Sequence, residues 1–174
     1  MPQAARFVVQ AFADDRDPML HAWLRFRDAV AAAEPVEAER HLAVAAAPVG
    51  RLPQPRLVDD APHITVWRLL APNNRELARS ARCYATPDDA LAHLAALREH
   101  AGGLRVATVA GSQAERHCWY LSLGLVPVLT CSRWYGVQSA SLESADAARR
   151  AMAEAPIEER VQVLNGSRRR PARR

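Results

Sequence analysis

The second half of this chain carries one pattern twice. The pattern is a tryptophan, a serine thirteen residues later and a tyrosine soon after the serine. The two copies start 52 residues apart and comprise Trp67, Ser80 and Tyr84, then Trp119, Ser132 and Tyr135. A repeated unit of this size is a supersecondary element that cannot bury its apolar face alone. The two copies are therefore expected to pack together and share one core.

The first copy predicts a strand, a turn, a returning strand, a helix and a last strand. The predicted strands cover 63–70, 77–85 and 104–109, with turn chemistry over 71–75. Thr86 is a favoured N-cap residue, and Pro87 suits the first helical position. The two aspartates that follow would face the positive end of the helix dipole. Gly102-Gly103 is expected to end the helix, whose buried stripe is Ala90, Leu94, Leu97 and Ala101.

The second copy predicts the same order of elements. Its strands are expected over 117–123, 127–135 and 160–166. Ser141 or Ser144 is expected to cap its helix, and Pro156 to end it. The segment between Tyr135 and this helix would then be longer than the segment after Tyr84.

The two copies resemble the tandem repeat of the YegP-like family of small bacterial proteins. The likeness includes the run Ser132-Arg133-Trp134-Tyr135 and the corner Tyr84-Ala85-Thr86, and spans about residues 62–166. The second copy departs from it by lacking an Asn-Gly-type turn. The resemblance implies an α+β fold of tandem β3-αβ repeats around one mostly antiparallel sheet. It also implies exchanged last strands, so that Leu104–Val109 and Arg160–Leu164 would each complete the other copy's edge. The family has no established activity, so the resemblance implies no site residues.

The composition divides the chain into three parts. Residues 1–61 form an N-terminal extension, residues 62–166 the tandem-repeat domain and residues 167–174 an arginine-rich tail expected to be disordered. Within the repeat domain the copies span 62–110 and 115–166. A proline-rich linker over 48–62 is expected to join the extension to the repeats.

The extension predicts a strand followed by helices. The strand covers 7–12, and Asp17 and Pro18 suit the start of a helix. Its apolar stripe would be Met19, Trp23, Phe26 and Val30, and a second helix is expected over 35–47. An alternative stays open, because residues 19–27 also alternate as a strand would. The region 7–47 would then be a third, degenerate copy of the repeat.

The net charge of +4 arises from the tail. Its five arginines are Arg168, Arg169, Arg170, Arg173 and Arg174, without which the net charge would be −1. Such tails bind phosphate backbones through charge alone, so these residues are candidate contacts to RNA or DNA. A solvated tail with no partner is the alternative. All 23 basic residues are arginine, which suggests a GC-rich coding sequence and weakens arginine content as evidence for nucleic-acid binding.

No motif indicates a catalytic, metal or cofactor site. Cys118 and Cys131 are expected nearly opposite each other on the second hairpin. One hypothesis is a thiol pair that, with His117, binds a metal or switches by redox, and the other is two small buried apolar residues. The odd count of three cysteines argues against a disulfide framework. His93 and His100 are expected on the exposed side of their helix. Trp119, Tyr120, Trp134 and Tyr135 are either core residues or a stacking platform for bases.

These observations predict a non-catalytic binding or assembly module, with an unknown protein partner or self-association. A nucleic-acid- or ribosome-associated protein held by its tail is the second hypothesis, and an enzyme with a cleft between extension and repeats the third. No cofactor is expected. The longest apolar run, 42–47, is too short to cross a bilayer. The start of the chain is unlike a signal peptide, so we expect a cytoplasmic location without membrane contact.

Overall fold

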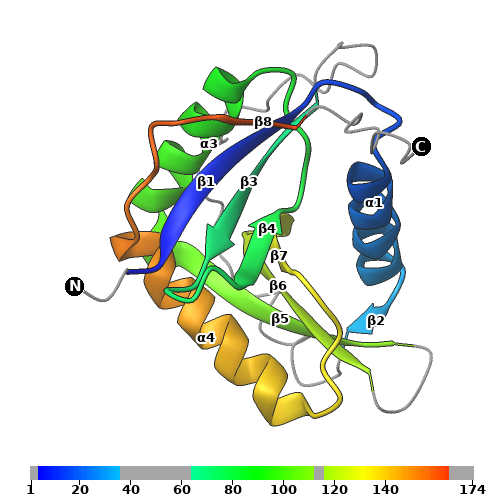
Figure 1. The fold of residues 1–174 in the computed structure, drawn as a ribbon. Coiled ribbons are helices and arrows are strands. Elements are labelled where there is room, and N and C mark those ends of the chain that lie inside the picture. The colour runs from blue at the N-terminus through cyan, green and yellow to red at the C-terminus, as the bar shows by residue number, and fades with distance from the viewer. Residues whose placement is uncertain (1–3, 36–63, 112–115, 165–174) are drawn as a thin grey trace.

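A computed structural model describes residues 4–35, 64–111 and 116–164, which form an α+β fold around one eight-stranded sheet (Figure 1). The strand order is β2-β5-β6-β7-β4-β3-β1-β8. Within this sheet all neighbours are antiparallel except β1 and β8. The strands are β1 (Arg6–Phe12), β2 (Glu34–Pro35), β3 (Ile64–Leu70), β4 (Glu76–Ser80), β5 (Leu104–Ala110), β6 (His117–Leu123), β7 (Val126–Cys131) and β8 (Gln162–Leu164). The helices are α1 (Pro18–Ala31), α3 (Pro87–Glu99) and α4 (Gln138–Glu154), with a 3-10 turn over Ala101–Gly103.

Helices α3 and α4 cover one face of the sheet, and α1 lies on the other side (Figure 1). Side chains alternate between the faces of a strand, so Trp67 points toward α3 while Arg68 points toward α1. The α3–α4 side holds most of the main core. Its fully buried residues include Trp67, Leu94, Leu97, Trp119, Leu121 and Met152. Burying a side chain of this size stabilises the fold by about 1.5–3 kcal/mol.

Helix α1 confirms the helical prediction for residues 18–31 and contradicts the alternative strand. The carboxylate of Asp17 accepts hydrogen bonds from the backbone N–H groups of Met19 (2.8 Å) and Leu20 (3.4 Å), which fixes the helix start. The predicted apolar stripe was partly wrong, because Met19 is 49% exposed and Leu20 is buried instead. Leu20 and Trp23 form a second cluster on this face with Phe12 and Val66.

Helix α4 begins earlier than predicted. It starts at Gln138, three residues after Tyr135, just as α3 starts three residues after Tyr84. The expectation of a longer connection after Tyr135 was therefore wrong. The residue before α4 is Val137, whose side chain cannot accept a hydrogen bond. The start of α4 thus depends on tertiary packing rather than on a serine cap.

Residues predicted as an extension supply an interior strand of the sheet. β1 lies between β3 and β8, so the first residues and the repeat region share one sheet. β5 pairs with β6, the first strand of the second copy. β8 pairs with β1 in parallel rather than with β3, which differs from the predicted exchange. Three predictions lie outside the described residues: the helix over 35–47, except for Pro35 in β2, the linker over 48–62, and the tail.

Candidate functional site

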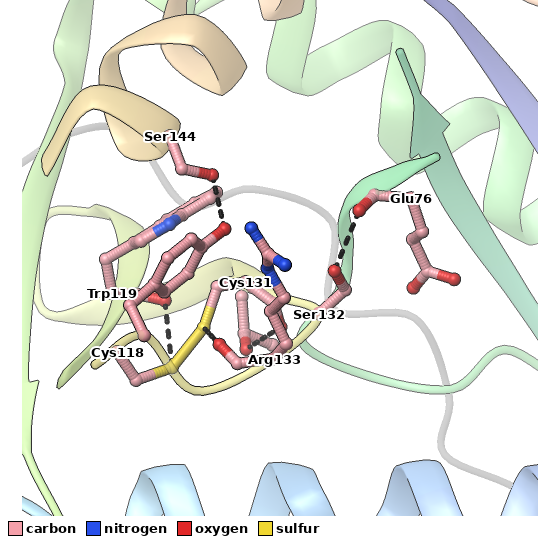
Figure 2. The surroundings of a disulfide bond; sticks show 9 residues. Glu76, Cys118, Trp119, Cys131, Ser132, Arg133 and Ser144 are labelled. Atoms are coloured by element: carbon pink, nitrogen blue, oxygen red, sulfur yellow. Dashed lines mark hydrogen bonds between the residues drawn. A yellow bond between two sulfur atoms is a disulfide. The ribbon is translucent and has the colours of Figure 1, made fainter. Parts of the chain in front are cut away.

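A disulfide joins Cys118 of β6 to Cys131 of β7 (Figure 2). The two strands turn tightly through Gly124, which adopts a φ of +60° that favours glycine, and Leu125. The prediction that the cysteines face each other is confirmed. The expectation of unpaired thiols was wrong, because the hairpin of twelve intervening residues brings the two side chains together. Both cysteines are fully buried.

The residues after Cys131 connect the disulfide to the neighbouring strand (Figure 2). The hydroxyl of Ser132 donates a hydrogen bond of 2.9 Å to the carbonyl oxygen of Glu76 in β4. The guanidinium of Arg133 lies 4.8 Å from the centre of the Tyr135 ring. The carbonyl oxygen of Arg133 lies 3.3 Å from the sulfur of Cys131, where a thiol S–H would find an acceptor.

Tyr84 and Tyr135 each close a corner of the sheet in the same way. The backbones of Thr65 and Tyr84 exchange hydrogen bonds of 2.9 and 2.8 Å, and those of His117 and Tyr135 exchange two of 2.8 Å. The hydroxyl of each tyrosine then bonds to the side chain nine residues later, on the following helix. The two corners thus fix both helices against the sheet through equivalent contacts.

In the first corner a buried chain of hydrogen bonds links Trp67, Tyr84 and His93. The indole N–H of Trp67 donates to the Tyr84 hydroxyl at 3.0 Å, and that hydroxyl lies 2.6 Å from Nδ1 of His93. With Nδ1 unprotonated, the Tyr84 hydroxyl accepts from Trp67 and donates to His93. The prediction that His93 is exposed was wrong, since only 6% of it is accessible. His100, at the end of the same helix, is exposed as predicted.

Among the described residues, three groups have clearly displaced pKa values, and all three displacements favour the neutral form. Burial lowers the pKa of His93 to about 4, assisted by the positive charge of Arg82. Burial raises the pKa of Tyr84 well above its usual range. Burial also raises the pKa of Cys83 to about 11, although the guanidinium groups of Arg27 and Arg79 oppose the rise. A thiol with so high a pKa is a poor nucleophile at neutral pH.

The lowered pKa of His93 predicts that the protein loses stability as the pH falls from about 6.5 to about 4. In this range the unfolded chain binds a proton at His93 and the folded chain does not. The free energy of unfolding therefore falls by at most about 1.4 kcal/mol per pH unit from this group. Urea denaturation at several pH values should show a smaller slope for His93→Gln than for the parent. His100→Gln, an imidazole lost from the same helix, is the control, and an equal change in both variants would contradict the prediction.

The second corner differs from the first in its side chains. The hydroxyl of Tyr135 donates to Oγ of Ser144 at 2.6 Å. The indole N–H of Trp119 is buried and has no hydrogen-bond partner in the described ranges. Trp119 and Tyr135 are buried, Tyr120 is half-buried, and Trp134 packs against Phe26 of α1 with ring centres 5.9 Å apart. The four aromatic residues therefore do not form an exposed stacking platform.

A cluster of charged side chains lies on the α1 side of the sheet. Arg68 of β3 and Arg79 of β4 are directly opposite each other. The carboxylate of Glu76 accepts hydrogen bonds from both, at 2.7 Å from Arg68 and at 2.6 and 2.8 Å from Arg79. Arg68 also donates to the side-chain oxygen of Gln10 at 3.3 Å. We call these four residues the arginine–glutamate cluster.

Trp23 of α1 covers this cluster. The guanidinium carbons of Arg27 and Arg79 each lie 5.5 Å from the centre of its ring. Cys83 lies close enough to both arginines for their charges to act on it. The sequence did not single out these residues as a site. The available signal was Arg68, a charged residue in the middle of the apolar strand Val66-Trp67-Arg68-Leu69-Leu70.

The remaining sequence predictions concern the arginine tail, a metal site and membrane contact. Arg168, Arg169, Arg170, Arg173 and Arg174 all lie outside the described residues. No group of three metal-ligating side chains occurs within residues 4–35, 64–111 and 116–164. None of the helices in these ranges is long and apolar enough to span a membrane. No protein-family model, curated protein or solved structure matches this chain.

Proposed function

We propose that this protein is a non-catalytic binding module whose recognition surface includes α1 and the arginine–glutamate cluster beneath it. The observation that supports a binding role is an excess of positive charge in that cluster. Two guanidinium groups share the single carboxylate of Glu76, and Arg79 is only 8% exposed. A partner that supplies negative charge at α1 would compensate this excess.

The displaced pKa values support a role without chemistry. Catalytic acids and bases need pKa values near the working pH. His93, Tyr84 and Cys83 are instead held neutral by burial, and two of them also serve the hydrogen-bond chain of the first corner.

We further propose that residues 62–166 are two copies of one unit, as in the YegP-like family that they resemble. The matching corners at Tyr84 and Tyr135 support this proposal, as does the equal spacing between each tyrosine and its helix. The two halves of this region would then have equivalent folds. Differences between the copies, such as His93 against Ser144, would belong to this protein in particular.

The binding proposal predicts that a partner contacts α1. A photoreactive amino acid should replace the exposed Arg25 on α1 and, as the matched control, the exposed Ala95 on α3. After irradiation in cells we expect an adduct from position 25 that is absent from position 95. An adduct of twice the chain mass would assign self-association. Equal adducts from both positions, or adducts from neither, would reject α1 as the recognition surface.

The second candidate function is nucleic-acid binding through the tail, supported by its five arginines. Each phosphate neutralised by an arginine contributes about −0.9 to the slope of log affinity against log salt for duplex DNA. Full-length protein is compared with a chain ending at Gly166, for RNA and DNA over a salt series. We expect truncation to remove most of the affinity and to reduce the slope by up to about 4.5. Equal binding by both chains, or by neither, would eliminate the tail as the contact.

A further inference from the structure

Two buried hydrogen-bond donors lack partners at the same place in the described structure. They are Nη1 of Arg79 and Nε1 of Trp23, and the two residues are 8% and 5% exposed. The guanidinium carbon of Arg79 lies 5.5 Å from the centre of the Trp23 ring, so the two side chains that carry these donors pack against each other between β4 and α1. The large majority of buried side-chain polar atoms in proteins have a partner. A pair of unsatisfied donors in one place therefore indicates a missing acceptor.

The charges around these donors indicate that the missing acceptor is an anion. Both oxygens of Glu76 are already used, Oε1 by Arg79 and Oε2 by Arg68 and Arg79. Arg27, the other cation at Trp23, pairs with its neighbour Asp28, whose side chain is 67% exposed. The carboxylate of Glu76 thus balances one of its two guanidinium groups, and one negative charge is missing.

We propose that a small carboxylate binds between Arg79 and Trp23, accepting one hydrogen bond from each. A carboxylate carries one negative charge and two coplanar acceptor oxygens, which matches one missing charge and two donors. Each donor atom has less than 1 Å² of accessible surface, so a ligand reaches it only after neighbouring side chains move, and a ligand of the size of formate needs the least movement. This inference rests on the proposed function, because it names the chemistry that the recognition surface would bind.

The site would connect two layers of the fold. Arg79 belongs to β4 and Trp23 to α1, so a bound carboxylate would be held by the sheet and by the helix that covers it. α1 meets β4 through the large side chain of Trp23, and its Phe26 packs against Trp134, which follows β7. Movement of these side chains would admit the ligand.

Indole N–H resonances test the proposal directly. The chain has four tryptophans, so a ¹⁵N-labelled sample gives four indole signals, which Trp→Phe variants assign. Formate is the probe, added to the full-length protein at constant ionic strength with chloride as the compensating ion. A ligand of three heavy atoms binds with a Kd of about 1 mM at best, so the titration extends to about 100 mM. We expect a saturating shift of the Trp23 signal.

Trp119 provides the matched control, because its indole N–H is also buried and unpartnered but lies away from the cluster. Its signal should stay in place, and Trp119→Phe should leave the Trp23 titration unchanged. Arg79→Lys should weaken formate binding by about tenfold or more, since one of the two hydrogen bonds is lost. If that variant does not fold, the parent titration still decides. A Trp23 signal that stays in place, shifts linearly or responds more strongly to phosphate would overturn the proposal, whatever the crosslinking result at α1.

Discussion

Replacing Glu76 by glutamine is expected to destabilise the protein by about 3 kcal/mol, a decrease of about a hundredfold in the ratio of folded to unfolded chains. Glutamine keeps the shape but removes the charge that both Arg68 and Arg79 need. The two arginines are directly opposite on neighbouring strands, an arrangement that is unfavourable without the carboxylate between them. The expected loss is at the lower end of the range for buried pairs, because 21% of the Arg68 side chain is exposed. Urea denaturation followed by tryptophan fluorescence measures it.

A second substitution distinguishes charge balance from simple loss of contacts. Adding Arg68→Gln to Glu76→Gln removes one of the two excess charges, so the double variant should be more stable than Glu76→Gln alone. Asp146→Asn, which breaks the exposed pair between Asp146 and Arg149, should change stability by less than about 0.5 kcal/mol. A double variant no more stable than the single one would show that charge excess is not the cause.

Local signals predicted the elements of the fold well. The Thr86-Pro87 start of α3 is seen as expected, with Thr86 Oγ1 accepting from the backbone N–H of Asp89 at 3.1 Å. The same chemistry predicted α1 from Asp17 and Pro18. Where no cap exists, as at Val137, the prediction put the helix start several residues late. Helix ends without a side-chain cap are determined by packing, which local sequence does not contain.

The long-range pairing of β1 could not be predicted from the sequence. The strand is separated from β3 by more than fifty residues, and nothing local indicates which strand it joins. Its place between β3 and β8 also explains why β8 does not reach β3. The first residues of the chain are therefore part of the same sheet as residues 64–131.

The candidate site could not be predicted from the sequence for a related reason. Arg68, Glu76 and Arg79 are ordinary charged residues in the sequence, and they become a cluster only through the register of β3 and β4. Trp23 comes from a segment assigned to a different part of the chain. His93 was placed on the wrong face, because an isolated histidine gives no sign of the tyrosine hydroxyl that will donate a hydrogen bond to it in the core. Sites assembled across strands depend on register, which composition and motifs do not specify.

Removing the disulfide is expected to cost about 3 kcal/mol, the loop-closure value for a loop of this size. The double variant Cys118→Ala, Cys131→Ala should therefore melt about 6–12 °C below the parent. Alanine is the better replacement because both positions are fully buried and a serine hydroxyl would need a partner. The reduced parent should be more stable than the double variant, since the Cys131 thiol can donate to the carbonyl of Arg133 and still fill its space.

Counting thiols determines whether the bond exists in the cell. In unfolded, non-reduced protein the disulfide leaves Cys83 as the single reactive thiol, and reduction should raise the count to three. Both hairpin cysteines are buried, so cells are quenched with acid and the denatured, non-reduced protein is alkylated. The thiol count then distinguishes a reducing compartment from an oxidising one. Because cytosolic reductants keep thiols reduced, three alkylated cysteines would support the cytoplasmic prediction and show that the hairpin carries free thiols there. One alkylated cysteine would instead place the protein in an oxidising compartment. Cys83→Ala is the control, and it should lower both counts by one without the loss of stability expected for the double variant.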